Sequence, residues 1–232
     1  MNWFITLGVI AGLLAVDQRA GWQSLLAQPV FSAVLVGSIL GEPWAALAVG
    51  VFLELIYLSI IPMRGVKTPD HIAAGVVGGG TTSLLLRGPG EPHIAFVCAV
   101  GLFIGFVAGE LGARLTFPMF GLQNRFLSSA EFSPDASRRR IARRVFLLHA
   151  SSVGFIFAVE GLLVLALCAG GYYAGERFTR LMNGALVHGA AWWQSLLTAI
   201  GAASIIHLFW QHRLRNALAV CAVLVVILLW LM

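Results

Sequence analysis

The chain is built from apolar runs separated by short polar breaks. A run of about 20 apolar residues can cross a bilayer as an α-helix, so the pattern predicts an all-α polytopic membrane protein. Several runs are shorter than a full span. We expect some of them to be re-entrant or broken, which requires shielding of the backbone by protein or by a water-filled cavity. About eight runs can be delimited: Trp3–Val16, Leu25–Leu40, Trp44–Ile61, Ile72–Leu86, Ile94–Ala113, Val145–Gly170, His188–Trp210 and Ala217–Met232.

Composition supports the membrane assignment and limits the chemistry. Apolar residues make up 59% of the 232 positions and charged residues 11%, whereas a soluble domain carries roughly 25% charged residues. The three cysteines lie in apolar runs and lack the spacing of a metal site or a disulfide framework. We therefore expect packing cysteines, no metal and no cofactor.

The basic residues are distributed unevenly. The longest polar stretch, Thr116 to Arg144, holds five arginines in its last seven positions. If all eight runs cross, 12 of the 15 basic residues share one set of loops. The positive-inside rule places that set in the cytoplasm, with both termini outside. The sequence thus divides into a membrane region over 1–114, a basic cytoplasmic linker over 115–144 and a second membrane region over 145–232.

Two interpretations of the basic linker stay open. Its arginines either hold the loop in the cytoplasm and contact anionic lipid headgroups, or they dock a cytoplasmic partner. Nothing in the pattern supports nucleic-acid binding, although the net charge is +5.

Glu54 stands in the middle of an apolar run over 45–61. A carboxylate at the centre of a membrane segment costs roughly 2.5 to 3.5 kcal/mol, so it must be paired, hydrated in a cavity or in contact with a polar ligand. A broken, charged segment from Pro62 to Pro69, with Arg64 and Lys67 inside it, follows directly. An acid beside an interrupted helix predicts a solute site within the membrane.

A series of short motifs in the first third of the chain carries a family resemblance. Order and spacing over roughly residues 10 to 80 resemble the membrane IIC subunit of the mannose/fructose/sorbose family of the bacterial phosphotransferase system. The sequence departs from the family pattern in three places: Arg64 and Lys67 replace small residues, Gln28 stands where arginine is frequent, and Glu42 stands where aspartate is frequent. The motifs are Asp17-Gln-Arg19, Gln28-Pro29, Val36-Gly-Ser-Ile-Leu-Gly41, Gly50-Val-Phe-Leu-Glu-Leu-Ile-Tyr-Leu58, Ile61-Pro62 and Pro69-Asp70.

The resemblance implies a sugar permease subunit of the bacterial cytoplasmic (inner) membrane with an elevator-type architecture. Such a subunit pairs with a IID membrane subunit and works with cytoplasmic IIA and IIB phosphocarriers, the latter phosphorylating a hexose-type sugar. It carries no phosphoacceptor or catalytic residue of its own. A homo-oligomer within the complex is also expected.

Four polar residues are the candidate sugar contacts. Sugars are neutral and rich in hydroxyls, so carboxylates and amides suit them. Glu54 is the first choice, and Asp70, Asp17 and Gln18 are the others.

Each candidate also has a structural interpretation. Glu54 could be buried against the cation of Arg64 or Lys67, and Asp70 could begin a helix, where its charge favours the positive end of the dipole. Asp17 and Gln18 could form a solvated turn.

Two other functions remain open from the sequence. In the first, the chain is a regulatory or sensory membrane subunit that keeps the fold without transport. In the second, it is an unrelated ion-coupled transporter with Glu54 or Glu160 as proton carrier.

Overall fold

The computed structural model describes residues 2–21, 23–57, 68–88, 93–128 and 138–181, together with Ala199 and Ala203. Within these ranges the chain is entirely helical and contains no strand, which confirms the predicted all-α class. The last two apolar runs, over 188–210 and 217–232, lie outside the described residues. The elements are α1 (Trp3–Ala20), the short 3-10 helix η1 (Leu25–Ala27), α2 (Pro29–Leu40), α3 (Pro43–Tyr57), α4 (His71–Leu86), α5 (Ile94–Ser128) and α6 (Arg138–Leu181).

The helices fall into two length classes. By length and composition, three are candidate membrane spans: α1 as a whole, α5 over Ile94–Thr116 and α6 over Arg139–Leu181. The other three, α2, α3 and α4, have 12, 15 and 16 residues. At 1.5 Å per residue they rise only about 18, 22 and 24 Å, less than the roughly 30 Å of a hydrocarbon core. The described part therefore combines full spans with short apolar helices.

Exposed apolar side chains cover the outside of the helices. On α1, Ile5, Val9 and Leu13 are exposed, whereas Leu7 and Ala11 on the opposite face are fully buried. The i, i+4 spacing of the exposed residues places them in one stripe along the helix. Such a stripe suits contact with lipid, because a soluble monomer rarely exposes large apolar patches.

Helix α4 forms the centre of the bundle. Every residue from Ile72 to Leu85 is buried, because α1, α2, α3, α5 and α6 all pack against it. Two of its three hydroxyl groups are satisfied within the helix, since Thr82 Oγ1 donates to Gly78 O and Ser83 Oγ to Gly79 O, both at 2.8 Å, whereas Thr81 Oγ1 has no partner among the described residues. This internal bonding allows a polar sequence to pass through a dry interior.

Glycines let α2 lie directly on α4. A Cβ added to Gly75 would overlap the Ser32 hydroxyl and come within 2.8 Å of Pro29 Cα. One added to Gly79 would lie 2.8 Å from Ala33 Cα. Close approach of backbones through small residues is the usual packing of membrane helices.

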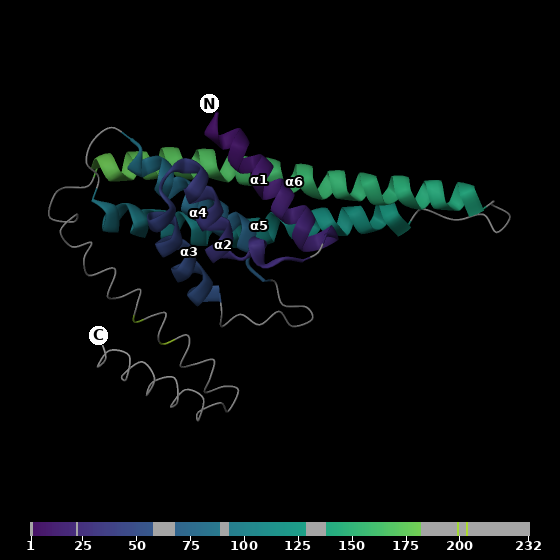
Figure 1. Cartoon of the computed structure of the whole chain (residues 1–232), viewed down its shortest axis with the longest axis horizontal. Coiled ribbons are helices and arrows are strands. Elements are labelled where there is room, and N and C mark those ends of the chain that lie inside the picture. Colours follow the sequence, from purple (N-terminus) through teal and green to yellow (C-terminus); the bar gives the residue numbers. More distant parts are fainter. Residues whose placement is uncertain are drawn as a thin grey trace, which may run out of the picture.

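The first and last described helices are joined in the same way. A Cβ on Gly8 of α1 would lie 2.7 Å from Gly161 O of α6, and a Cβ on Gly161 would lie 2.9 Å from Gly8 O. Helix α5 continues to Ser128 and α6 begins at Arg138, so helices enter the predicted 115–144 linker from both sides. Figure 1 shows these ends of α5 and α6 extending beyond the other helices.

Candidate functional site

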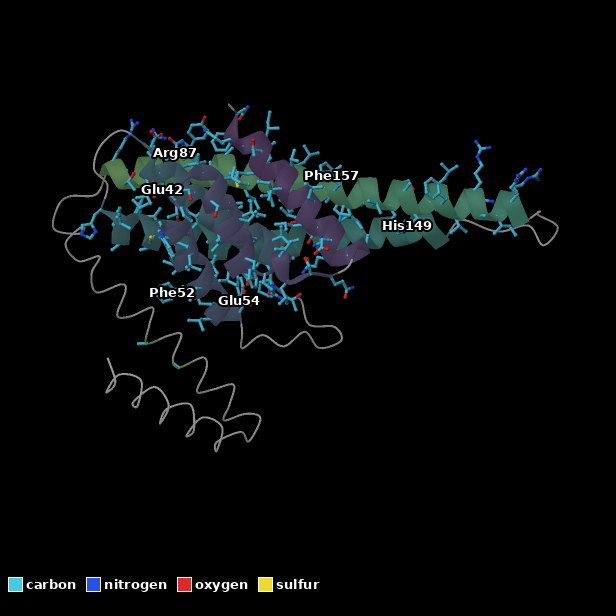
Figure 2. All side chains as sticks on the ribbon, viewed as in Figure 1. Glu42, Phe52, Glu54, Arg87, His149 and Phe157 are labelled. Carbon is cyan, nitrogen blue, oxygen red and sulfur yellow. The ribbon has the colours of Figure 1, made fainter. Side chains whose placement is uncertain are left out.

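Four helix ends meet at one end of the bundle. The end of α1, the start of α2, the end of α3 and the start of α4 are linked there by side-chain contacts. Figure 2 labels Glu54 near this end of α3, with Glu42 at the opposite end of the same helix. Because α2, α3 and α4 are too short to span a bilayer, their polar ends can lie at membrane depth.

Glu54 is half-buried in the last turn of α3 and faces the start of α2. The backbone N–H of Val30 donates to Glu54 Oε2 at 3.5 Å. Pro29 and Val30 form the first turn of α2, where unpaired N–H groups and the helix dipole favour an anion. Arg64 and Lys67, the suggested ion-pair partners of Glu54, lie outside the described residues. Among the described residues, Val30 is the one that bonds the Glu54 carboxylate, so its oxygens can accept further hydrogen bonds.

Gln28, Tyr57 and His71 extend this polar surface over α2, α3 and α4. His71 Nδ1 lies 2.9 Å from Gln28 Oε1. The tautomer of His71 decides which of the two groups donates in this contact. The His71 ring stacks on Tyr57 with centroids 5.4 Å apart and planes 4° apart. Tyr57, only 2% exposed, donates to Phe106 O at 3.4 Å.

None of these three residues is a predicted ligand from the sequence alone. Gln28 stands out there only as a departure from a family pattern, and neither Tyr57 nor His71 is among the candidates. Each nevertheless flanks a selected motif: Gln28 precedes Pro29, Tyr57 follows Glu54 by three positions and His71 follows Asp70. Proximity to those motifs was the available signal.

Asp70 begins α4, as the structural interpretation of its motif predicted. Its Oδ1 accepts from the N–H of Ala73 at 3.1 Å, and its own N–H donates to Gly109 O at 2.9 Å. The residue is 6% exposed. Its second oxygen, Oδ2, lies 3.7 Å from Arg19 Nη2, so Asp70 is both a helix cap and a member of an ion pair.

Arg19 also reaches a second acid. Its Nη1 donates to Glu160 Oε2 at 2.8 Å, and the side chain of Glu160 is 0% exposed. Positions 19 and 160 are 141 residues apart, so no local spacing rule could have paired them. From the sequence, Glu160 is a secondary candidate for function and a possible proton carrier.

Asp17 and Gln18 lie at the end of α1, on the same side of the bundle. Asp17 Oδ2 accepts from the backbone N–H of Ser24 at 3.0 Å and from its hydroxyl at 2.5 Å. These bonds close the turn after α1, which agrees with the structural interpretation of Asp17. Gln18 is half-buried beside it. Over the described ranges, no group of three or more His, Cys, Asp or Glu side chains is arranged to hold a metal ion.

Comparisons with known proteins cover nearly the whole chain. Residues 2–231 match a family model described as "PTS system sorbose-specific iic component". A protein of Escherichia coli (strain K12), "Putative N-acetylgalactosamine permease IIC component 2", is 30% identical over 121 residues, which are 51% of this chain and 85% of the relative. A solved structure described as "Structure of membrane protein" shares the fold, with a TM-score of 0.62 and 16% identity over 99% of this chain and 94% of that one.

Proposed function

Because the chain belongs to the sorbose-specific IIC family of the phosphotransferase system, whose members are membrane permease components for sugars, we propose that it carries a hexose-type sugar to a cytoplasmic IIB partner. That partner phosphorylates the sugar on arrival. Neither the regulatory subunit nor the ion-coupled transporter is favoured by the comparisons.

The observation that carries this proposal is the convergence of Glu54, Gln28 and His71 from three short helices. Glu54 is half-buried and offers carboxylate oxygens, and Gln28 and His71 add a carboxamide and an imidazole at the same end of the bundle. A carboxylate can accept from two adjacent hydroxyls of a sugar ring. Stacking on the buried Tyr57 ring holds the His71 imidazole in place before a sugar binds. Glu54 is our first sugar contact.

The other predicted sugar contacts take supporting places in this proposal. Asp70 shapes the base of the site, because its cap bond fixes the first turn of α4. Asp17 and Gln18 form the rim at the end of α1, where the turn closed by Ser24 presents them together.

The position of the site along the bundle supports delivery to the cytoplasm. Arg19 at the end of α1 meets Glu160, and the exposed Arg144 lies 16 positions before Glu160 on the same helix. That is about 24 Å at 1.5 Å per residue. The site thus lies toward the end of the bundle from which the basic ends of α5 and α6 extend (Figure 1). The positive-inside rule assigns such an end to the cytoplasm.

Family membership also implies work in a complex with other phosphotransferase components. We propose a IID membrane subunit, cytoplasmic IIA and IIB phosphocarriers and a homo-oligomer as its partners. We carry over the elevator-type architecture and the bacterial inner membrane from the resemblance. Three exposed arginines at the start of α6 are proposed to contact lipid headgroups or a cytoplasmic subunit: Arg139, Arg140 and Arg143.

Glu54→Gln tests the proposed site. Glutamine keeps the shape but removes the charge, and a hydrogen bond to a charged group is worth about 1.5 to 3 kcal/mol. We expect sugar binding to weaken by roughly 10- to 150-fold, with loss of phosphorylation at low sugar concentration. The measurement is phosphoenolpyruvate-dependent phosphorylation of labelled sorbose and N-acetylgalactosamine by membranes that contain the chain with IIA, IIB and IID.

Glu42→Gln is the matched control, because Glu42 flanks the opposite end of α3 (Figure 2). It should leave phosphorylation unchanged. Wild-type activity of Glu54→Gln, at equal abundance in the membrane, would remove Glu54 from the sugar site.

A further inference from the structure

Glu160 is a buried acid in the middle of a long apolar helix. Its side chain is 0% exposed, and its contact with Arg19 is short, at 2.8 Å. Its other oxygen, Oε1, is buried and has no hydrogen-bond partner among the residues that the structure describes. An ionisable side chain inside a membrane helix is costly and normally marks function. Glu160 lies on α6, whereas the candidate sugar site is formed by α1 to α4.

Arg19 connects Glu160 to that site. One guanidinium nitrogen, Nη1, bonds Glu160 at 2.8 Å, and the other, Nη2, lies 3.7 Å from Asp70 Oδ2. The shorter, charge-assisted contact to Glu160 is the stronger of the two. Glu160 therefore holds one side of the guanidinium, while the other side faces Asp70.

Asp70 links the position of the Arg19 guanidinium to the sugar site. Its carboxylate caps α4 through Ala73 at 3.1 Å, and its N–H is tied to Gly109 O at 2.9 Å. The next residue is His71, which bonds Gln28 and stacks on Tyr57. A shift of Asp70 would thus move the ring that lines the site.

We propose that Glu160 is a positioning residue for sugar binding, which acts from α6 by holding Arg19 against Asp70 at the start of α4. This inference rests on the proposed function. Stability alone does not call for such an arrangement, because a buried ion pair can often be replaced by apolar residues at no cost.

Glu160→Gln tests this role. Glutamine keeps the length and one acceptor but weakens the hold on Arg19, so the guanidinium is no longer fixed in its position against Asp70. We expect the KM for sugar to rise by up to about a hundredfold, the size of loss that a 1 Å misplacement caused by a remote mutation can produce. The maximal rate and the amount of folded protein should stay near wild type. Glu160→Asp, which keeps the charge, should give an intermediate KM.

Glu176→Gln is the matched control. Glu176 lies on the same helix and bonds Arg180 at 2.6 Å, but it is far more exposed. The probes are labelled sorbose and N-acetylgalactosamine, used with membranes that contain the full complex. The control should leave the KM unchanged.

Two outcomes would overturn the inference while leaving the proposed function intact. One is a wild-type KM in Glu160→Gln when Glu54→Gln has lost sugar binding. The other is loss of folded protein in Glu160→Gln with a wild-type KM in Glu160→Asp, which would make Glu160 structural. If Glu54→Gln also behaves as wild type, it is the proposed sugar site that fails.

Discussion

Arg19→Leu is expected to destabilise the bundle by about 3 to 5 kcal/mol, the cost of breaking a buried ion pair by removing one partner. Arg19 is the cation that faces both Asp70 and Glu160. Without it, two buried carboxylates from α4 and α6 lose the positive charge between them. The measurement is the fraction of purified protein that remains monodisperse in detergent after heating, together with unfolding in increasing denaturing detergent.

The double variant Arg19→Leu with Glu160→Leu should recover part of this loss. It removes the Glu160 carboxylate, which has lost its cation, and fills its place with an apolar side chain, a replacement that is often tolerated. Arg180→Leu is the control, since it breaks the more exposed pair with Glu176 and should cost at most about 1 kcal/mol. If Arg19→Leu unfolds at the same temperature as the wild-type protein, the buried network does not hold these helices together.

Gly75→Leu is the second change with a large expected effect. Gly75 faces α2, and a Cβ there would lie 2.8 Å from Pro29 Cα and 2.9 Å from Pro29 O, besides overlapping the Ser32 hydroxyl. Backbone atoms cannot rotate away as a side chain does, so α2 and α4 must separate. We expect a loss of roughly 3 kcal/mol, the upper part of the range for overpacking, measured by the same detergent unfolding.

Gly170→Leu is expected to change stability in the opposite direction. A Cβ at Gly170 of α6 would meet nothing within 4 Å, and leucine is a much better helix former than glycine, by about 0.8 kcal/mol. This variant should be as stable as wild type or more stable. Adding Ser32→Ala to Gly75→Leu should not restore stability, because the Pro29 contacts remain. Full recovery would show that the hydroxyl alone is the obstacle.

The apolar pattern located the described helices well but not their ends. The run Ile72–Leu86 corresponds to α4 within one residue, whereas Ile94–Ala113 ends 15 positions before α5 does. Hydropathy marks where a helix is buried, but backbone bonding continues into polar residues. The run Leu25–Leu40 was wrong as one segment. It breaks at Gln28, because Pro29 has no N–H for a preceding turn and instead begins α2.

The candidate site was only partly accessible from sequence. Glu54 and Asp70 could be selected because a lone charge in an apolar run is expensive and a Pro-Asp pair resembles a helix start. The partnership of Arg19 with Glu160, 141 positions away, depends on how α1 packs against α6. The contact of Gln28 with His71 depends on α2 packing against α4. The glycines of α4 permit this packing, but they do not specify which helix packs there.

The burial of α4 on every side has a consequence for how the protein is made. This helix is only 16 residues long and contains Gly78-Gly-Gly80-Thr-Thr-Ser83, and its neighbours α5 and α6 follow it in the chain. It leaves the ribosome before two of the helices that shield it from lipid exist. The N-terminal half therefore cannot acquire its final packing during its own synthesis. Completion of the bundle waits for α6, whose Glu160 and Gly161 close the contacts with Arg19 and Gly8.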